Sequence, residues 1–272
     1  MRINSLIAVT AALLFGGFCF ASGTTRASEP APPCKAPAAL TDLEQTLPHT
    51  SALIAAGEPV KIIAIGSSST AGSGASSPAA SYPSRLAVEL GRQFPRSKIT
   101  MINRGINGQE SGDILARLKT DVIDEKPDLV LWQVGTNSVL RDHAVSTVAA
   151  HIDEGVKQIK AIGADVVLVD PQFAPRVIAK AETDDMIKLI SVSAKKHKIG
   201  VFHRYSVMKH WRETQGIPFE TFVAPDGLHH NDWSYGCWAK LMSVSITQAV
   251  SKPTLSAHVG PAPTVVPASA KP

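Results

Sequence analysis

The sequence predicts an α/β fold in which a five-stranded parallel sheet is covered by helices on both faces. Five short apolar runs, rich in β-branched residues, recur along the 272-residue chain. They are continuous rather than alternating, which is typical of strands that are buried on both faces. Segments with helical spacing lie between them, and strand–helix alternation indicates a parallel sheet. The hydrophobic fraction of 44% is enough to form a core.

The expected strands are Lys61–Ile65, Lys98–Ile102, Leu129–Val134, Val166–Val169 and Ile199–Phe202. Between and after them, apolar residues repeat every three or four positions, which predicts amphipathic helices. The helical patterns run over Ile114–Val122, Val145–Ile159, Met186–Ile190 and Trp238–Ile246. In open parallel sheets, ligands bind beyond the carboxyl ends of the strands. We therefore expect the functional residues to follow the strands directly.

An apolar stretch near the N-terminus predicts a secretory signal peptide over residues 1–27. Arg2 precedes the run Leu6–Phe20, and three small residues follow it, in the order that signal peptides show. The run is shorter than the ~20 apolar residues of a membrane-spanning helix, although a retained anchor is the alternative. We therefore expect a periplasmic or secreted protein with no stable membrane insertion after cleavage.

The rest of the chain divides into three parts by composition. Residues 28–58 are rich in Pro and Ala and become more helix-like around Thr41–Leu47. Residues 251–272 carry Pro, Ala and Ser without periodicity, which indicates a disordered tail. The folded domain is therefore expected over residues 59–250. The formal charge of +4 comes without a block of like charges, and a nucleic-acid partner needs a concentrated basic surface, so no nucleic acid is expected as a partner.

Cysteine usage fits export. Cys19 lies in the expected signal peptide, so the mature chain keeps Cys34 and Cys237. An even number of cysteines in an oxidising compartment permits a disulfide. Two independent thiols, with Cys237 simply buried, are the alternative, and the sequence leaves both open.

A loop rich in hydroxyl groups follows the first expected strand, with the sequence GSSSTAG over residues 66–72. It lacks the Lys of a P-loop and the spacing of a dinucleotide-binding motif, which argues against nucleotide binding. A G-x-S-x-G elbow is also missing, which argues against an α/β-hydrolase. What remains is a cluster of hydroxyls at a strand end. One of these oxygens is either open to a ligand or caps a helix.

Polar side chains also follow the second and third strands, and an acid–imidazole pair lies late in the chain. Residues 103–109 (NRGINGQ) contain two glycines that allow close backbone approach. Asn137 can donate to a developing negative charge on oxygen, and both stretches also fit ordinary turns. Asp226 stands three residues before His229. This spacing lets the carboxylate accept the Nδ1–H of the imidazole and leaves Nε2 free to take a proton.

No histidine pattern matches a zinc site. His229 and His230 are adjacent, an H-E-x-x-H motif is missing, and the other histidines lack the spacing of metal ligands. We therefore expect no metal ion and no other cofactor.

The four loops together, in this order along the chain, resemble the blocks of the SGNH (GDSL-like) hydrolase family, in particular bacterial exported esterases. The matching stretches are residues 65–72, 103–108, 135–137 and 226–229. The resemblance implies a three-layer α/β/α, flavodoxin-like fold. It also implies that Ser68 is the nucleophile, His229 its base and Asp226 the partner that orients the base. The amides of Ser68 and Gly108 and the side chain of Asn137 would form the oxyanion hole.

The first block departs from the family pattern. The family usually has Gly-Asp-Ser, whereas Ser67 stands here in place of the Asp. Three consecutive serines leave Ser67 and Ser69 as alternative nucleophiles, although alignment on the glycine favours Ser68. The role of His230, either a packed neutral imidazole or one that faces the substrate, stays open.

The resemblance implies an exported serine esterase that hydrolyses acyl esters, of O-acetyl or short-chain type, on a small molecule or a carbohydrate. One alternative is an O-acyltransferase that passes the same acyl group to a carbohydrate hydroxyl. Another is a non-catalytic envelope-binding protein with this fold. The sequence does not fix the acyl length, the alcohol portion or the oligomeric state.

Overall fold

The computed structural model describes residues 31–252 of the chain. The expected signal peptide, Cys19 and residues 253–272 of the expected tail lie outside the described residues. Within residues 31–252, no helix combines the length and the apolar character that crossing a membrane requires.

Five parallel strands form one sheet in the order β2-β1-β3-β4-β5. They are β1 (Val60–Gly66), β2 (Ile99–Gly105), β3 (Leu129–Gln133), β4 (Asp165–Val169) and β5 (Gly200–Phe202). This is the strand order of flavodoxin-like folds, and it confirms the predicted fold class. The expected burial on both faces is wrong for β2, because this strand lies at an edge of the sheet and its residues are either partly buried or exposed.

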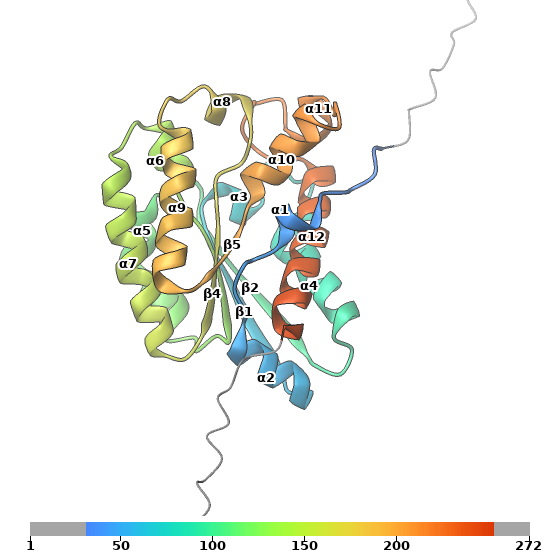
Figure 1. The fold of residues 1–272 in the computed structure, drawn as a ribbon, viewed down its shortest axis with the longest axis vertical. Helices are drawn as coiled ribbons and strands as arrows, with labels where there is room; N and C mark the ends of the chain where they lie inside the picture. The colour runs from blue at the N-terminus through green and yellow to red at the C-terminus, as the bar shows by residue number, and fades with distance from the viewer. Residues whose placement is uncertain (1–30, 253–272) are drawn as a thin grey trace, which may run out of the picture. The chain divides into compact units, whose positions relative to one another are not determined.

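Helices cover both faces of the sheet, which gives three layers (Figure 1). One face carries α5 (Ser111–Ala116), α7 (Val145–Ala161) and α9 (Thr183–His197), and the other carries α4 (Tyr82–Gln93), α10 (Arg204–Glu213) and α12 (Asp232–Ser251). Shorter helical turns lie in the connections: α3 (Ser68–Ala71), a 3₁₀ turn (Pro78–Ala80), α6 (Thr136–Leu140), α8 (Pro175–Ile178) and α11 (Phe219–Phe222).

Successive residues of a strand point to opposite faces, so the sheet separates two hydrophobic cores. On one side, Ile62 of β1 belongs to the same buried cluster as Leu86 of α4 and Trp238 of α12. On the other side, Ile63 belongs to a cluster with Ile152 of α7. Because both faces are covered, the loops at the strand ends are the part of the sheet that can form a site.

One expected helix is interrupted. The pattern over 114–122 predicts a single helix, but α5 ends at Ala116 and Lys119–Ile123 forms a π-helical turn. The apolar residues Leu118 and Val122 are still fully buried in the same cluster. Periodicity therefore identified the buried face correctly, although it did not detect the local change in helix type.

The N-terminal segment packs against the same domain, so the folded part begins before the expected start at residue 59. Helices α1 (Ala38–Thr41) and α2 (Pro48–Ala56) flank the stretch that was expected to be helix-like, and residues 42–47 are not helical. Leu47 precedes a proline, which disfavours the helical conformation, and its φ and ψ of −117° and 76° are not helical. Leu43 and Leu47 are only 2% and 1% exposed, so the segment contributes to the core.

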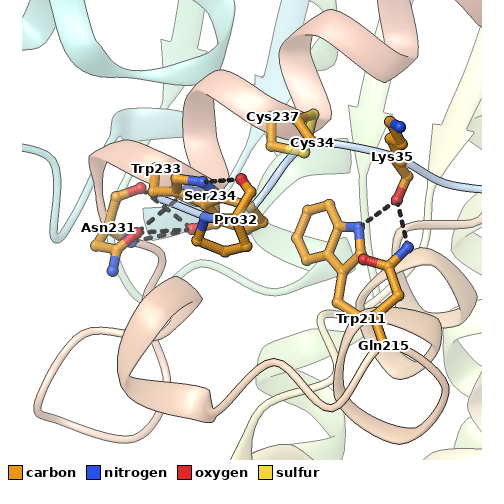
Figure 2. The surroundings of a disulfide bond; sticks show 9 residues. All are labelled: Pro32, Cys34, Lys35, Trp211, Gln215, Asn231, Trp233, Ser234 and Cys237. Carbon is orange, nitrogen blue, oxygen red and sulfur yellow. Dashed lines mark hydrogen bonds between the residues drawn. A yellow bond between two sulfur atoms is a disulfide. The ribbon is translucent and has the colours of Figure 1, made fainter. Parts of the chain in front are cut away.

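A disulfide ties this segment to α12. Cys34 is bonded to Cys237, 203 positions later in the sequence. Figure 2 shows two tryptophans of the domain beside it, each donating its indole N–H to a backbone carbonyl of the N-terminal segment. Trp211 donates to the carbonyl of Lys35 (3.0 Å) and Trp233 to that of Pro32 (3.2 Å). Of the two possibilities that the sequence left open, the structure has the disulfide.

Candidate active site

The loops at the carboxyl ends of the strands bring the expected site residues to one pocket. The pocket has a volume of about 330 Å³. It is lined by Ser68, Ser73, Asn107, Gly108, Asn137, Leu140, Arg141, Arg176, Leu228 and His229. Ser68 starts α3 directly after β1, and Asn137 lies in α6 directly after β3. Asp226 is the one expected site residue that does not line the pocket.

Ser68, His229 and Asp226 form a continuous hydrogen-bonded row. The Nε2 atom of His229 lies 2.9 Å from Oγ of Ser68, and Nδ1 lies 2.5 Å from Oδ2 of Asp226. Since the carboxylate accepts the Nδ1–H, Nε2 is left with a lone pair that faces the serine hydroxyl. This is the arrangement that activates a serine for attack on a carbonyl carbon.

A short turn explains how Asp226 reaches His229. The amide of Gly227 donates to the carbonyl of Ala224 (3.0 Å), and Val223 pairs with His230 in an antiparallel bridge. The other carboxylate oxygen of Asp226, Oδ1, accepts the amides of Leu228 (3.0 Å) and His229 (2.9 Å). The turn therefore fixes the backbone of the histidine and its ring partner together.

Burial by itself would raise the pKa of the Asp226 carboxyl. The hydrogen bonds from the amide and ring of His229 and from the amide of Leu228 outweigh it and hold the pKa below its usual value. The carboxylate is therefore ionised at neutral pH, as an acceptor for the imidazole must be.

Of the three consecutive serines, only Ser68 lines the pocket. Ser67 is 2% exposed, and both its amide (2.8 Å) and its hydroxyl (2.9 Å) donate to Oε1 of Gln133. It occupies the N-cap position of α3 but makes no side-chain cap bond. Ser69 is 1% exposed, and its hydroxyl has no hydrogen-bond partner within the described residues. The geometry therefore favours Ser68 over its neighbours as the reacting hydroxyl.

Hydrogen-bond donors surround the space next to Ser68. The side-chain nitrogen of Asn137 donates to the carbonyl of Gln109 (2.8 Å), which uses one of its two hydrogens and fixes the amide at the pocket. Gly108 has a φ of +77°, and its carbonyl accepts from Arg141 (2.9 Å). In the part of the chain that the structure describes, the amides of Ser68 and Gly108 bind no protein acceptor, so both are available to a ligand oxygen.

A second set of polar side chains lies beneath the pocket and is almost fully buried. We call this set the buried polar chain. Its members are Gln133, Thr136, Gln172, Arg204 and His230, which are between 0% and 3% exposed. Arg204 donates to Oε1 of Gln172 (3.0 Å), to the carbonyl of Asp170 (2.9 Å) and to Nε2 of His230 (3.3 Å). Burial lowers the pKa of the Arg204 guanidinium to about 10, so it is charged at neutral pH.

His230 is a packed neutral imidazole and does not face the pocket. Burial, together with the charge of Arg204 and the neighbouring His229, lowers the pKa of His230 well below its usual value. Its ring lies 5.0 Å from the ring of Tyr235 and 5.4 Å from that of Trp238, measured between centroids. Two adjacent histidines therefore have opposite surroundings, and only His229 reaches Ser68.

The loop after β1 touches the histidine loop at Gly74. A Cβ atom on Gly74 would lie 2.2 Å from the carbonyl oxygen of His230 and 3.2 Å from Cβ of His229. Its φ is +86°, a conformation that favours glycine. The two loops that carry Ser68 and His229 therefore meet through backbone contact at this position.

No sequence motif singled out Gln133, Gln172 or Arg204 of the buried polar chain, or the two arginines of the pocket, Arg141 and Arg176. Gln133 is a polar residue inside an otherwise apolar strand, and this was a usable signal. Gln172 and Arg204 lie in stretches without a motif. Among residues 31–252, no group of three His, Cys, Asp or Glu side chains is arranged to hold a metal ion.

Comparisons with known proteins agree with this fold. A 77-residue stretch is 34% identical to an arylesterase of Vibrio mimicus, which covers 28% of this chain and 38% of the arylesterase. A solved two-domain esterase active on acetylated mannans superimposes with a TM-score of 0.67 at 21% identity, over 82% of this chain and 59% of that one. An acetyl-xylooligosaccharide esterase from Geobacillus gives 0.61 at 21% identity, over 70% of this chain and 95% of that one.

At 21% identity, the similarity to the two solved structures shows the fold alone. The matched stretch spans well under half the length of the arylesterase. The family is shown by a match over most of the chain. The model of the Non-GDSL lipase-like family matches residues 33–252, which include the disulfide-linked N-terminal segment. The resemblance to SGNH hydrolases is thereby confirmed, and the chain belongs to the Non-GDSL lipase-like family.

Proposed function

We propose that this protein is a serine esterase that hydrolyses short acyl esters, with Ser68 as nucleophile, His229 as general base and Asp226 as the residue that orients the base. The observation that carries the proposal is the 2.9 Å contact between Oγ of Ser68 and Nε2 of His229, backed by the ionised Asp226. A serine hydroxyl is a weak nucleophile unless such a base takes its proton.

The reaction follows from these positions. His229 takes the Ser68 proton while Oγ attacks the ester carbonyl, and the carbonyl oxygen gains a negative charge. The amides of Ser68 and Gly108 and the Asn137 side chain stabilise that charge. His229 then gives its proton to the departing alcohol. In the second half of the reaction, His229 takes a proton from water as the water attacks the acyl-enzyme carbonyl. It then returns the proton to Oγ, which releases the carboxylic acid and regenerates Ser68.

The proposed substrates are O-acetyl or other short acyl esters of carbohydrates. The pocket around Ser68 is small, at about 330 Å³. Two solved structures of the same fold carry names that state action on acetylated mannans or acetyl-xylooligosaccharides. We further propose that the protein acts outside the cytoplasm. The Cys34–Cys237 disulfide supports this, since disulfides persist in oxidising compartments.

Labelling with a fluorophosphonate, followed by mass-spectrometric mapping of the modified residue, tests the proposal directly. We expect modification at Ser68 and hydrolysis of 4-nitrophenyl esters, fastest for the shortest acyl chains, together with acetate release from acetylated xylan or mannan. The Ser68→Ala variant is the control for both assays. Absence of labelling and of hydrolysis in the folded protein would reject the esterase, and acetyl transfer to an added sugar in preference to water would identify a transferase.

A further inference from the structure

The buried polar chain binds the sequence neighbours of both reacting residues. Ser67, directly before Ser68, donates its amide and its hydroxyl to Gln133. The carbonyl of Leu228, directly before His229, accepts the side-chain nitrogen of Gln172 (3.1 Å). On the other side of His229, the ring of His230 accepts from Arg204 (3.3 Å). One set of side chains therefore holds both loops from below.

The hydrogen bonds between these two ends form a directed row. Gln133 donates its side-chain N–H to the hydroxyl of Thr136 (3.5 Å), and Thr136 donates to Oε1 of Gln172 (3.0 Å). Arg204 donates to the same oxygen (3.0 Å). Hydrogen bonds in such a row polarise one another in a low-dielectric interior, so the row is stronger than its separate members.

Burying the charged guanidinium of Arg204 at this position costs free energy, because the group loses its hydration. Its side chain is 0% exposed, and among the described residues no carboxylate oxygen lies within 4.0 Å of it, although the charge of the buried Asp170 carboxylate opposes the lowering of its pKa. Neutral acceptors and the ring of Trp238, 5.3 Å away between guanidinium carbon and centroid, replace its hydration. Burying a charged group usually costs more free energy than burying an apolar side chain of the same size, and the hydrogen bonds of Arg204 hold Gln172 and His230 in fixed positions.

We propose that Gln172 and Arg204 are positioning residues that fix the distance between Ser68 Oγ and His229 Nε2 by linking the two loops through the buried polar chain. The expected effect on catalysis rests on the proposed function, whereas the structural link between the two loops does not depend on it. Neither residue lines the pocket, so both act through the backbone of the reacting residues. A misplacement of about 1 Å between reacting groups lowers rates by about 100-fold.

The Gln172→Met variant tests the linkage with little change in side-chain volume. Met keeps the shape but supplies neither the donor to Leu228 nor the acceptor for Thr136 and Arg204. We expect kcat for 4-nitrophenyl acetate and the rate of Ser68 phosphonylation to fall together by about 10- to 100-fold. We expect KM to stay within about twofold, because the pocket lining is intact.

Three threonine variants separate positioning from general loss of stability. Thr136→Val removes the hydroxyl that joins Gln133 to Gln172, and Thr136→Ser restores it, so kcat should fall in the first and recover in the second. Thr50→Val is the matched control, since Thr50 is 1% exposed and its hydroxyl donates to Oδ2 of Asp165 (2.8 Å) at the amino end of β4, the opposite end of the sheet from the pocket. It should lower Tm and leave kcat unchanged.

Amide hydrogen exchange supplies a readout that needs no activity. Peptides covering residues 66–71 and 226–230 should exchange faster in Gln172→Met and in Thr136→Val than in the wild type or Thr50→Val. The linkage is wrong if the two site-directed variants keep both kcat and exchange at wild-type values. The linkage is also wrong if kcat falls in proportion to Tm in all variants, Thr50→Val included. If Gln172→Met does not fold, the Thr136 pair decides alone. If the wild type does not react with the phosphonate, the proposed esterase function is rejected. The hydrogen-exchange rates of the variants still test the link between the two loops in that case.

Discussion

Two groups of polar side chains lie one above the other at the carboxyl edge of the sheet, and they differ in their access to solvent. In the upper group, the side chains of His229 and Asp226 are 20% and 43% exposed. In the buried polar chain below, Arg204 and His230 are 0% exposed. Groups that exchange protons with a substrate must be accessible from the pocket. Groups that only hold other residues in place are most rigid when they are shielded from solvent and hydrogen-bonded. The difference separates the residues that we propose to react from those that we propose to position them.

The largest expected effect distinguishes Ser68, which lines the pocket, from the adjacent Ser67, which binds Gln133 of the buried polar chain. Ser68→Ala should lower kcat by at least about 10³-fold, because the nucleophile is lost while the oxyanion donors remain. Ser67→Ala removes one buried hydrogen bond worth about 1 kcal/mol, so kcat should fall by less than about tenfold. Steady-state kinetics on both variants makes the comparison. A larger loss of kcat in Ser67→Ala than in Ser68→Ala would identify Ser67 as the nucleophile and would contradict the division between the two groups.

The next effect concerns the donors around the pocket. Asn137→Ala should lower kcat by about 10²–10³-fold, which corresponds to the ~2.7–4 kcal/mol that one oxyanion donor supplies. KM should change little, because the bond to the developing charge forms mainly in the transition state. Equal kcat values for Asn137→Ala and wild type, measured on the same ester, would remove Asn137 from the mechanism.

The disulfide variant should change stability without changing the chemistry. Replacing Cys34 and Cys237 by Ser together removes the crosslink, and such losses typically lower the free energy of unfolding by about 2–4 kcal/mol. Urea denaturation should show this decrease, while kcat at 25 °C should stay within about twofold of the wild type, since neither cysteine lines the pocket. A large loss of kcat in the folded variant would show that the site depends on the outer crosslink as well as on the buried polar chain.

The smallest effect compares the two adjacent histidines by pH. His230 has a lowered pKa in the folded state, so the unfolded chain takes up its proton first. Its contribution to stability is therefore complete above about pH 6.5 and is lost as the pH falls below that value. One group gives a slope of at most about 1.4 kcal/mol per pH unit.

The His230→Asn variant should be less stable at pH 7 but should lose less additional stability between pH 7 and 5. Thermal melts of the wild type and the variant across this range measure the difference in slope. Parallel pH dependences in the two proteins would show that His230 is not held neutral by its surroundings.

The sequence predicted the fold because the strands carry their own signal. Val130, Leu131 and Trp132 form a continuous apolar run whose buried position follows from composition alone. Helix α4 was not identified, although Leu86 and Leu90 are spaced by four residues and both are buried. Helix α10 was hidden because Arg204 occupies one of its buried positions, and arginine is among the residues that are least often fully buried.

The site was predictable where its contacts are local. Asp226 and His229 are three residues apart, and one turn brings them together. Ser68 and Asn137 were identified by the family blocks, and the structure places both at the pocket. Gln172 instead binds the carbonyl of Leu228, 56 residues away, and the guanidinium of Arg204, 32 residues away. Such contacts depend on which strand ends become neighbours, and no local pattern in one sequence records that.

The close contact at Gly74 limits how this protein can be redesigned. A substitution there that introduces a side chain would push the histidine loop away from Ser68, because the first added carbon already collides with the backbone of His230. Libraries intended to admit bulkier acyl or alcohol groups are therefore best confined to other side chains of the pocket lining, such as Leu140, Arg141 and Arg176, with residue 74 left invariant.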